Sequence, residues 1–292
     1  MANKEILKIG VVAKPTSDLA VEAIQKTIEC GTKYGIEVLL DKTSAKLVKG
    51  KGFEHAILLD SIDALLVLGG DGTFLATARL AADRSVPLLG VNLGSLGFIT
   101  EVAIGELEEA MERLRKGDYE VEERIMVDIK VENNHGTVQK LALNDVVLTR
   151  KNIAKMVELS IAINREHVTR YKADGLIIAS PTGSTAYALS TGGPILYPTL
   201  DSLVICPICP HTLSNRPLVV SGDYIIEVDI GAGQDEVIAT LDGQVSIDIG
   251  EHDHLTISRS ESITRLIKVP GRTHFDTLRS KLGWGGSSNP NG

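Results

Sequence analysis

The stretch ALLVLGGDGT, residues 64–73, decides how the first part of this chain folds. Its apolar run, 64–68, is typical of a buried strand, and the glycines predict a tight turn into a helix that begins at Phe74. Without Cβ atoms, the N–H groups of the turn can come close to a phosphate, and the helix start adds unpaired N–H groups and the positive end of a dipole. We therefore predict a phosphate-binding turn at Gly69, Gly70, Gly72 and Thr73.

Asp71 is the carboxylate of this turn. Beside bound phosphates, a carboxylate suggests a base that prepares a hydroxyl for phosphoryl transfer, so Asp71 is the catalytic candidate. The alternative is a plain strand-to-helix turn in which Asp71 caps the helix, because Gly-Asp-Gly is also common in turns. The turn alone does not separate these interpretations, and the rest of the chain has to do so.

Strand-like and helix-like segments alternate on either side of the turn. Short apolar strands are predicted at 6–13, 36–40, 64–68 and 86–91. Helical spacing links Val21, Ile24 and Ile28, and it recurs over 74–82 and 107–114. Such alternation predicts a parallel sheet with helices on both faces. Ligands of such sheets bind at the carboxyl ends of the strands, which is where the glycine turn lies.

The pattern changes near Glu120, after which apolar residues recur with a period of two. This period is typical of antiparallel or sandwich-like β structure, and it covers the segments 125–131, 157–163, 226–230, 245–249 and 255–257. We therefore predict an α/β N-terminal domain with a parallel sheet, residues 1–122, and a β-rich, sandwich-like C-terminal domain, residues 123–269. A helix is expected at 273–282, and we expect 270–292 to pack back on the first domain.

Composition argues against several classes of partner. The 292 residues carry a formal net charge of −8 and 4% aromatic residues, which disfavours a nucleic-acid partner. No apolar run approaches the roughly 18 residues of a membrane span, and the N-terminus lacks the apolar stretch of a signal peptide. We therefore expect a cytoplasmic protein that binds neither a membrane nor a nucleic acid.

The three cysteines fit a reducing compartment and no disulfide framework. Cys206 and Cys209 have CxxC spacing and His211 lies nearby, but a zinc site needs a fourth ligand and the chain has no second Cys pair. Pro207 and Pro210 favour an extended loop over the helix start of a redox motif. We therefore predict a structural loop here and assign no metal ligand.

Three polar clusters interrupt the strands of the second part. The first is Asn144-Asp145, which lies between the apolar runs 141–143 and 146–148. An Asn amide beside a carboxylate can read a base edge and a ribose hydroxyl. An Asx turn is the structural alternative for this pair.

The second cluster begins at Asp174-Gly175 and continues, after an apolar strand, through the hydroxyl- and glycine-rich stretch 180–194. Its Ser and Thr side chains and backbone N–H groups suit phosphate or amide recognition, although a long surface loop is the commoner meaning of this composition. The third cluster is Asp242-Gly243-Gln244. It is first of all a hairpin turn, because Asp-Gly between strands is typical of one.

Taken in order, the glycine turn, Asn144-Asp145, the stretch 174–194 and the segment PHTLSNRP (210–217) resemble NAD kinases over nearly the whole chain. The GGDGT turn alone is shared with diacylglycerol and sphingosine kinases and, in variant form, with phosphofructokinases. The stretch 174–194 and the segment 210–217 are more specific, and the chain is most similar to bacterial-type NAD kinases. It has neither a P-loop nor a GxGxxG dinucleotide motif.

The resemblance implies an enzyme that phosphorylates the adenosine ribose 2′-hydroxyl of NAD with ATP, giving NADP and ADP. Asp71 matches the family's proton acceptor, and Gly72 its neighbour in the NAD site. The other NAD contacts implied, mostly in the second domain, are Asn144, Asp145, Asp174, Thr185, Ala186, Tyr187, Ala188, Leu189, Ser190 and Gln244. Lys155 and Lys172 match substrate-binding positions that often carry another basic residue or His, and Lys lacks the planar fork of Arg.

The same resemblance implies Mg²⁺ or another divalent cation, carried mainly by the nucleotide. It implies ATP or, as in some members, inorganic polyphosphate as the phosphoryl donor. It also implies a homodimer or homotetramer in which neighbouring subunits complete the NAD site. Two alternatives stay open: a related kinase of a lipid or sugar hydroxyl, which should lack Asn144-Asp145 and the stretch 174–194, and a non-catalytic dinucleotide sensor, which has no need of Asp71.

Overall fold

The computed structural model describes residues 4–100, 102–133, 136–151, 156–212, 214–231 and 237–284. The chain divides into two compact units: unit 1 comprises residues 1–122 and 265–292, and unit 2 comprises residues 123–264. The chain leaves unit 1 along β7 (Glu120–Asn133) and returns to it along β18 (His254–Lys268).

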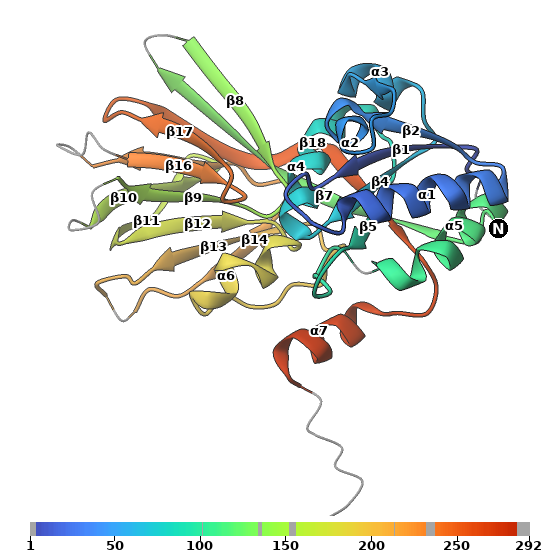
Figure 1. Cartoon of the computed structure of the whole chain (residues 1–292). Coiled ribbons are helices and arrows are strands. Elements are labelled where there is room, and N and C mark those ends of the chain that lie inside the picture. Colours follow the sequence, from blue (N-terminus) through green and yellow to red (C-terminus); the bar gives the residue numbers. More distant parts are fainter. Residues whose placement is uncertain are drawn as a thin grey trace, which may run out of the picture. The chain divides into compact units, whose positions relative to one another are not determined.

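A parallel sheet forms the centre of unit 1 (Figure 1). Its strands follow the order β18, β5, β4, β1, β2, β3, and each of these neighbours pairs in parallel. The bounds are β1 (Lys8–Ala13), β2 (Glu37–Asp41), β3 (Gly52–Phe53), β4 (Ala64–Gly69) and β5 (Leu88–Asn92), with β6 (Val102–Ala103) beside β5. Every residue of β4 and β5 is buried, as their continuous apolar runs predict.

Helices cover both faces of this sheet. Successive residues of a strand point to opposite sides, so a continuous apolar strand presents apolar side chains to both faces. On one face, Ile9 and Val11 of β1 share a buried cluster with α1 (Ala20–Tyr34) and α5 (Leu107–Lys116). On the other, a Cβ at Gly10 would meet Leu58 of α3 (His55–Asp60), and one at Gly90 would meet Phe74 of α4 (Asp71–Ala81). The predicted parallel sheet with helices on both faces is therefore confirmed. Further helical segments are α2 (Lys42–Leu47), α7 (His274–Leu282) and the short turns Ala82–Arg84 and Ile104–Glu106.

Helix α1 buries a face different from the one that its large apolar residues suggest. Ile24 is buried, but Val21 and Ile28 are 37% and 38% exposed. The buried residues are Ala20, Ala23, Ile24, Thr27, Cys30 and Gly31. The helix lies so close to β2 that a Cβ on Gly31 would be 2.5 Å from Val38 Cγ2. Close approach therefore selects small side chains on this face.

The short elements α2, α3 and β3 have no counterpart among the predicted ones. They contain 6, 6 and 2 residues, which is too few to show a period. Helix α2 depends on a cap instead: the Asp41 carboxylate accepts hydrogen bonds from the N–H groups of Thr43 at 3.1 Å and Ser44 at 2.8 Å.

Unit 2 contains two antiparallel layers (Figure 1). The first has the order β14 (Leu218–Ser221), β13 (Ser202–Ile208), β12 (Gly175–Ala179), β9 (Asp145–Arg150), β16 (Val237–Leu241), β17 (Val245–Ile249). The second has the order β11 (Glu166–Ala173), β10 (Val157–Ile163), β15 (Ile226–Ile230), β18, with β7 joined to β18 and β8 (Gly136–Ala142) to β7. Leu148 and Leu176 of the first layer share one buried cluster with Leu159 and Val228 of the second. The predicted fold class, an α/β part and a β-rich, sandwich-like part, is confirmed.

The CxxC segment lies mostly in a strand, so the prediction of a loop is wrong for its first three residues, 206–208. Cys206 and Pro207 belong to β13, where Cys206 pairs with Ile177. Burial raises the pKa of the Cys206 thiol to about 11, which makes it a poor thiolate. Cys209 is exposed and follows the strand. The strand forms because both of its faces are buried: Leu203 and Ile205 lie in one apolar cluster, and Val204 and Cys206 lie in another. This burial outweighs the proline signal.

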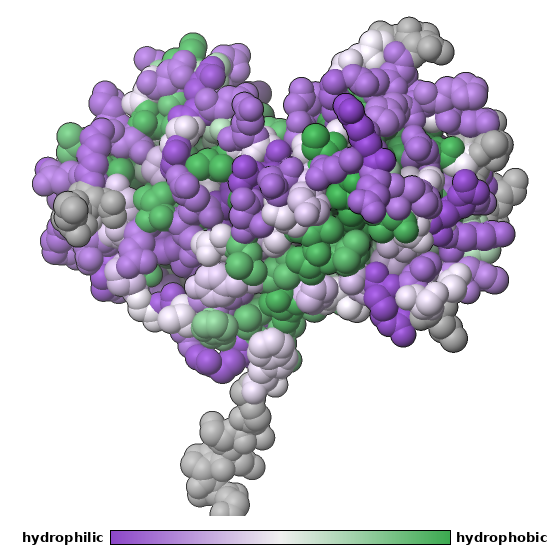
Figure 2. All heavy atoms as spheres, turned by 180° about the vertical axis from the view of Figure 1, so that it is seen from behind, coloured by the Kyte–Doolittle hydropathy of each residue, from purple (hydrophilic) through white to green (hydrophobic). Residues whose placement is uncertain are grey.

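Hydrophilic residues cover most of the face seen in Figure 2, and hydrophobic residues are gathered in smaller areas. In the described ranges, no helix is long and apolar enough to cross a membrane. The largest fully buried side chains include Phe74, Leu66 and Met111, all in unit 1.

Candidate active site

The glycine turn connects β4, which ends at Gly69, to α4, which begins at Asp71. A Cβ on Gly69 would lie 2.5 Å from Thr73 Oγ1, so the first turn of the helix requires glycine there. Gly72 and Thr73 lie within that turn, and the Thr73 N–H donates to the Gly70 carbonyl at 3.0 Å. Helix α4 has no side-chain cap, so the alternative role of Asp71 as a helix cap is wrong.

The Asp71 carboxylate is instead held by the loop after β5. The Phe98 N–H donates to Oδ2 at 2.8 Å. Oδ1 accepts hydrogen bonds from the Ile99 N–H at 3.2 Å, the Thr100 N–H at 3.1 Å and the Thr100 hydroxyl at 2.9 Å. Two carboxylate oxygens offer about four acceptor positions, and three donors crowd onto Oδ1. The acceptor position left open is therefore on Oδ2.

Asn92 ties this loop to the end of β5. Its Nδ2 donates to the Thr100 hydroxyl at 2.8 Å, and its Oδ1 accepts from the Gly94 N–H at 2.6 Å. Asn92 is 4% exposed, so both of its hydrogen bonds are shielded from water. The side chain thus orients the Thr100 hydroxyl toward Asp71. Asn92 was not predicted from the sequence, although its place at the end of a buried strand was a usable signal.

A cavity of about 400 Å³ opens beside Asp71 at the carboxyl ends of β1, β4 and β5. Its lining includes the glycine turn, Asn92, the start of the loop after β5, and the side chains of Lys14, Ser17 and Lys281. Two ammonium groups and a turn rich in N–H groups make this cavity suited to an anion. Lys14 and Lys281 lie in sequence regions without a motif, so the sequence analysis missed them.

A second cluster, in unit 2, surrounds Asn144 and Asp145. The Asp242 carboxylate accepts hydrogen bonds from the N–H groups of Leu143 at 3.1 Å, Asn144 at 2.7 Å and Asp145 at 3.3 Å. Asp242 and Gly243, with φ of 50° and 66°, form the turn between β16 and β17, so the hairpin interpretation is confirmed. Asp242 also has a positioning role that the hairpin signal did not suggest.

Asp145 has a carboxyl group with a raised pKa, and Asn144 has a buried amide oxygen without a hydrogen-bond partner. Asp145 is 4% exposed, and burial raises the pKa of its carboxyl to about 7, with a further contribution from the Asp242 carboxylate. The Oδ1 atom of Asn144 is buried and has no hydrogen-bond partner. Buried polar groups are nearly always paired. The unpaired amide oxygen of Asn144 could therefore accept a hydrogen bond from a bound ligand.

The stretch 180–194 packs against Asn144 in short helical turns, Gly183–Thr185 and α6 (Tyr187–Ser190). A Cβ on Gly183 would lie 2.1 Å from the Asn144 carbonyl oxygen, so this approach requires glycine. Ser180, Ser184 and Ala188 are buried, so the alternative of a surface loop is wrong for the first part of the stretch. In its second part, Ser190, Gly192 and Pro194 are exposed.

Several hydroxyls of this stretch bond to the protein's own carbonyls. Ser180 donates to Leu143 at 2.6 Å, Ser184 to Pro181 at 2.6 Å and Thr185 to Thr182 at 3.2 Å. These hydroxyls are therefore not the free donor array that their composition suggests. Tyr187, in contrast, is 47% exposed and presents its ring to solvent.

The remaining predicted residues do not all gather at one place. Gln244 follows the Asp242-Gly243 turn, and its N–H donates to Leu241 at 2.9 Å. Lys172, at the end of β11, and Asp174, just before β12, lie at the opposite end of β12 from Ala179, which pairs with Asp145. Along a strand this separation is about 17 Å. Lys155 lies outside the described residues.

Comparison with known proteins decides the family. A model of the ATP-NAD kinase N-terminal domain matches residues 9–119, and a model of the ATP-NAD kinase C-terminal domain matches residues 143–269. The NAD kinase of Geotalea daltonii is 42% identical over 280 residues, which cover 95% of this chain and 99% of that protein. The chain belongs to the NAD kinase family.

Other relatives agree with this membership. The NAD kinase of Syntrophotalea carbinolica is 41% identical over 281 residues, covering 95% of this chain and 99% of that protein. The crystal structure of yeast NADH kinase complexed with NADH superposes with a TM-score of 0.87 and 26% identity, covering 97% of this chain and 89% of that one. The structure of an NAD kinase from Archaeoglobus fulgidus in complex with ATP superposes with a TM-score of 0.77 and 28% identity, covering 94% of this chain and 98% of that one.

As a member of the NAD kinase family, the chain is a phosphotransferase that makes NADP and ADP from NAD and ATP. The resemblance read from the glycine turn and the stretch 174–194 is confirmed. Nothing in the comparisons favours a lipid kinase, a sugar kinase or a dinucleotide sensor.

Proposed function

We propose that Asp71 accepts the proton of the 2′-hydroxyl of NAD while that oxygen attacks the terminal phosphorus of the donor. The observation that carries this proposal is the fixed orientation of the carboxylate, with three donors on Oδ1 and one on Oδ2. A hydroxyl can donate to the open position of Oδ2 without displacing a protein donor. Because phosphoryl transfer depends mostly on positioning and charge neutralisation, a carboxylate that cannot rotate is well suited to it.

The donor phosphates would lie in the cavity beside Asp71. The first turn of α4, an 11-residue helix, supplies N–H groups, and Lys14 and Lys281 supply positive charge. As the new O–P bond forms, the bond from the terminal phosphorus to the leaving oxygen breaks and ADP departs. Positive charge around that oxygen stabilises the charge that it gains. Inorganic polyphosphate has the same phosphate chemistry and is a second candidate donor.

A divalent cation would accompany the donor, and we propose Mg²⁺. In the described part of the chain, no group of three His, Cys, Asp or Glu side chains could hold a metal ion. The cavity has one carboxylate and two lysines, a set that fits a cation carried by phosphate oxygens rather than by protein ligands. When bound, the cation neutralises phosphate charge, and the lysines complete that neutralisation.

NAD would be held in unit 2 by the region around Asn144. The unpaired Asn144 Oδ1 can accept a hydrogen bond from the dinucleotide, and Asp145 can accept one from a ribose hydroxyl. Gly72, next to Asp71, is a further proposed contact by resemblance. The other proposed contacts in this part of the chain are Thr185, Ala186, Tyr187, Ala188, Leu189, Ser190 and Gln244.

Lys172 and Asp174 would serve the NAD site of a neighbouring subunit. Asp174 lies about 17 Å along β12 from the residue that pairs with Asp145, and Lys172 precedes Asp174 by two residues. This separation supports a homodimer or homotetramer with shared sites. Lys155 is proposed for the same role by resemblance. We also propose a cytoplasmic location, which agrees with three cysteines that form no disulfide in the described residues.

The decisive experiment measures ADP release by the purified chain with ATP and Mg²⁺, with and without NAD, together with NADP. We expect ADP release only with NAD and an equal amount of NADP. Stabilisation by NAD without turnover would support a sensor. Turnover with a lipid or sugar hydroxyl, and none with NAD, would overturn the proposal.

A further inference from the structure

Every backbone N–H and carbonyl group of Leu143, Asn144 and Asp145 has a hydrogen-bond partner inside unit 2. The three N–H groups donate to the Asp242 carboxylate at 3.1, 2.7 and 3.3 Å. The Leu143 carbonyl accepts from the Ser180 hydroxyl at 2.6 Å, and the Asn144 carbonyl accepts from the Ser180 N–H at 2.8 Å. The Asp145 carbonyl accepts from the Asp242 N–H at 3.0 Å. The polar groups that remain for a ligand are therefore mainly the side chains of Asn144 and Asp145.

The two residues that hold this segment, 143–145, come from separate parts of unit 2. Asp242 lies in the turn between β16 and β17, 98 residues from Asn144. Ser180 follows β12 and is fully buried, and its hydroxyl also accepts a hydrogen bond from the Gly183 N–H at 3.2 Å. A segment that is bonded to two separate elements has little freedom to rotate.

The orientation of the Asn144 side chain depends on this rigidity. Its Oδ1 atom is buried and has no hydrogen-bond partner in the described part of the chain, so no bond fixes the amide oxygen itself. Its peptide unit, in contrast, is bonded on both sides, and a Cβ on Gly183 would lie 2.1 Å from its carbonyl oxygen. The backbone therefore sets the direction of the amide before a ligand arrives.

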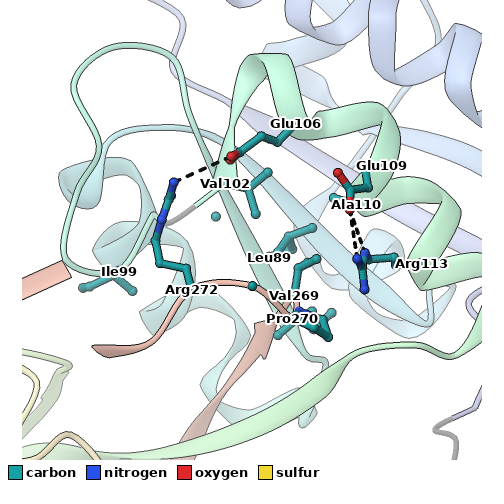
Figure 3. A pocket seen from close by; sticks show the side chains of 13 residues that line it. Leu89, Ile99, Val102, Glu106, Glu109, Ala110, Arg113, Val269, Pro270 and Arg272 are labelled. Carbon is teal, nitrogen blue, oxygen red and sulfur yellow. Dashed lines mark hydrogen bonds and ion pairs between the residues drawn. The ribbon is translucent and has the colours of Figure 1, made fainter. Parts of the chain in front are cut away.

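Charged groups at another cavity, in unit 1, are held in a different way (Figure 3). This cavity has a volume of about 290 Å³ and lies beside α5. On its rim, Arg113 donates to Glu109 at 3.1 and 2.9 Å, and Arg272 lies 3.6 Å from Glu106. These pairs join partly exposed side chains, and such pairs hold a geometry weakly. A carboxylate that accepts three backbone N–H groups, like that of Asp242, is a firmer anchor.

We propose that Asp242 and Ser180 are positioning residues of the NAD site. They hold the segment 143–145 so that the Asn144 amide oxygen and the Asp145 carboxyl meet the dinucleotide, and they act through these two side chains. This role rests on the proposed contacts of Asn144 and Asp145 with NAD. Groups that are ordered in advance bind more tightly, because binding does not have to order them. Loss of either anchor therefore weakens NAD binding.

The same turn geometry occurs at Asn164, which is not among the proposed NAD contacts. Asn164 and Arg165 connect β10 to β11 with φ of 50° and 69°. Asp242 and Gly243 connect β16 to β17 with φ of 50° and 66°. The Asn164 Oδ1 accepts from the Ile225 N–H at 3.0 Å, and the Asn164 N–H donates to the Ile225 carbonyl at 2.9 Å. Asn164 is therefore a matched control, because it combines a turn with a side-chain anchor but holds a different segment.

Asp242→Gly separates the anchor from the turn. Glycine adopts positive φ readily, and Gly-Gly is a favoured pair in such turns, so the hairpin is kept while the carboxylate is lost. We expect the KM for NAD to rise by roughly tenfold or more, since a misplacement of about 1 Å can have a larger effect than this. Because uniform binding is lost, kcat and the KM for ATP should stay close to wild type. Asn164→Gly should change none of these constants.

A folded Asp242→Gly enzyme with the wild-type KM for NAD would overturn the proposal. Equal increases in Asp242→Gly and Asn164→Gly would also overturn it, because any disturbed turn of unit 2 would then have the same effect. If circular dichroism shows that Asp242→Gly does not fold, Asp242→Asn takes its place, since Asn tolerates the same φ and keeps one acceptor oxygen. We expect a KM for NAD roughly threefold higher in that variant, and no increase would exclude the carboxylate as an anchor.

Ser180→Ala tests the second anchor. Loss of its hydroxyl should raise the KM for NAD by roughly threefold or more and leave kcat near the wild-type value. The control is Ser260→Ala, because Ser260 is also buried in unit 2 and its hydroxyl accepts from the Ser262 N–H at 3.0 Å. A wild-type KM for NAD in folded Ser180→Ala would exclude Ser180 as a positioning residue.

Asn144→Ala distinguishes failure of the positioning role from failure of the proposed NAD site. It removes the proposed contact itself, and we expect the KM for NAD to rise by roughly tenfold. An unchanged KM for NAD in both Asn144→Ala and Asp145→Ala would mean that the proposed NAD site is wrong. An increase in Asn144→Ala without one in Asp242→Gly would mean that only the positioning role is wrong.

Discussion

Gly97 lies so close to Asp71 that a Cβ on Gly97 would be 1.9 Å from Asp71 Oδ1 and 2.5 Å from Thr100 Oγ1. No atom can sit at that distance without moving its neighbours. The loop after β5 can therefore wrap around the Asp71 carboxylate only because this position has no side chain. Gly97 becomes a direct test of how far catalysis depends on the orientation of Asp71.

Gly97→Ala should displace the carboxylate from its four donors. We expect kcat to fall by roughly a hundredfold, because a misplacement of about 1 Å can have that effect, while the unit 1 core stays intact. The measurement is kcat with circular dichroism as the check on folding. Gly105→Ala is the matched control, since a Cβ there meets nothing within 4 Å. A folded Gly97→Ala enzyme with the wild-type kcat would mean that the four hydrogen bonds to the Asp71 carboxylate do not matter for turnover.

Asp71→Asn replaces the proposed base by an amide of the same shape. We expect kcat to fall by roughly 10²–10⁴-fold, the usual contribution of general base catalysis, while the protein stays folded and keeps much of its NAD binding. Asp223→Asn, an exposed carboxylate in unit 2, should leave turnover unchanged. Wild-type turnover by a folded Asp71→Asn variant would falsify the proposed role.

Thr100→Val removes the hydroxyl that donates to Asp71 Oδ1 and accepts from Asn92 Nδ2. Thr100 is fully buried, so the Asn92 amide loses its partner in a dry environment. We expect unfolding free energy to fall by about 1–3 kcal/mol and kcat to fall as well. Thr100→Ser keeps the hydroxyl and should restore kcat. If Thr100→Ser were as slow as Thr100→Val, the methyl group and not the hydroxyl would be the important part.

Lys14→Ala and Lys281→Ala remove the ammonium groups of the cavity beside Asp71. We expect each to raise the KM for ATP by roughly tenfold, in line with loss of one charge-assisted contact, and to change the KM for NAD much less. Lys140→Ala, an exposed residue of β8, is the control. An increase of the KM for NAD alone would mean that these lysines contact the acceptor, NAD, rather than the phosphoryl donor.

Asp145 gives a prediction for the pH dependence of stability. Its pKa rises from 3.8 to about 7 on folding, first through burial and then through the Asp242 carboxylate. The folded state therefore holds this proton more tightly. The associated stability is complete below about pH 4 and is lost as the pH rises through 7, with an upper limit of roughly 4 kcal/mol.

Asp145→Asn should remove this pH dependence. Denaturant unfolding between pH 4.5 and 8 should give a smaller fall in unfolding free energy for the variant than for the wild type. Asp248→Asn is the control, because Asp248 is an exposed residue paired with Lys151. Parallel curves for the wild type and Asp145→Asn would mean that Asp145 is charged in the folded protein across this range.

Local features of the chain were predictable from the sequence because their physical causes are local. The glycine turn at 69–73 follows from a buried strand, absent Cβ atoms and a helix start. The Asp242-Gly243 turn follows from the preference of these residues for positive φ. The change from an α/β pattern to a period of two likewise marks where the parallel sheet gives way to antiparallel strands.

Contacts between distant residues decided the rest. Asp71 meets its donors 27 to 29 residues away, and Asp242 meets Asn144 at a separation of 98 residues. Such pairs leave no period or motif in the sequence. Neither the hydrogen-bond donors of Asp71 nor the positioning role of Asp242 could therefore be predicted from it. The same is true of Lys14 and Lys281. The sequence by itself determined the family and predicted which residues carry its chemistry. Only the tertiary structure decided which groups orient them, because orientation depends on how separate strands and loops pack together.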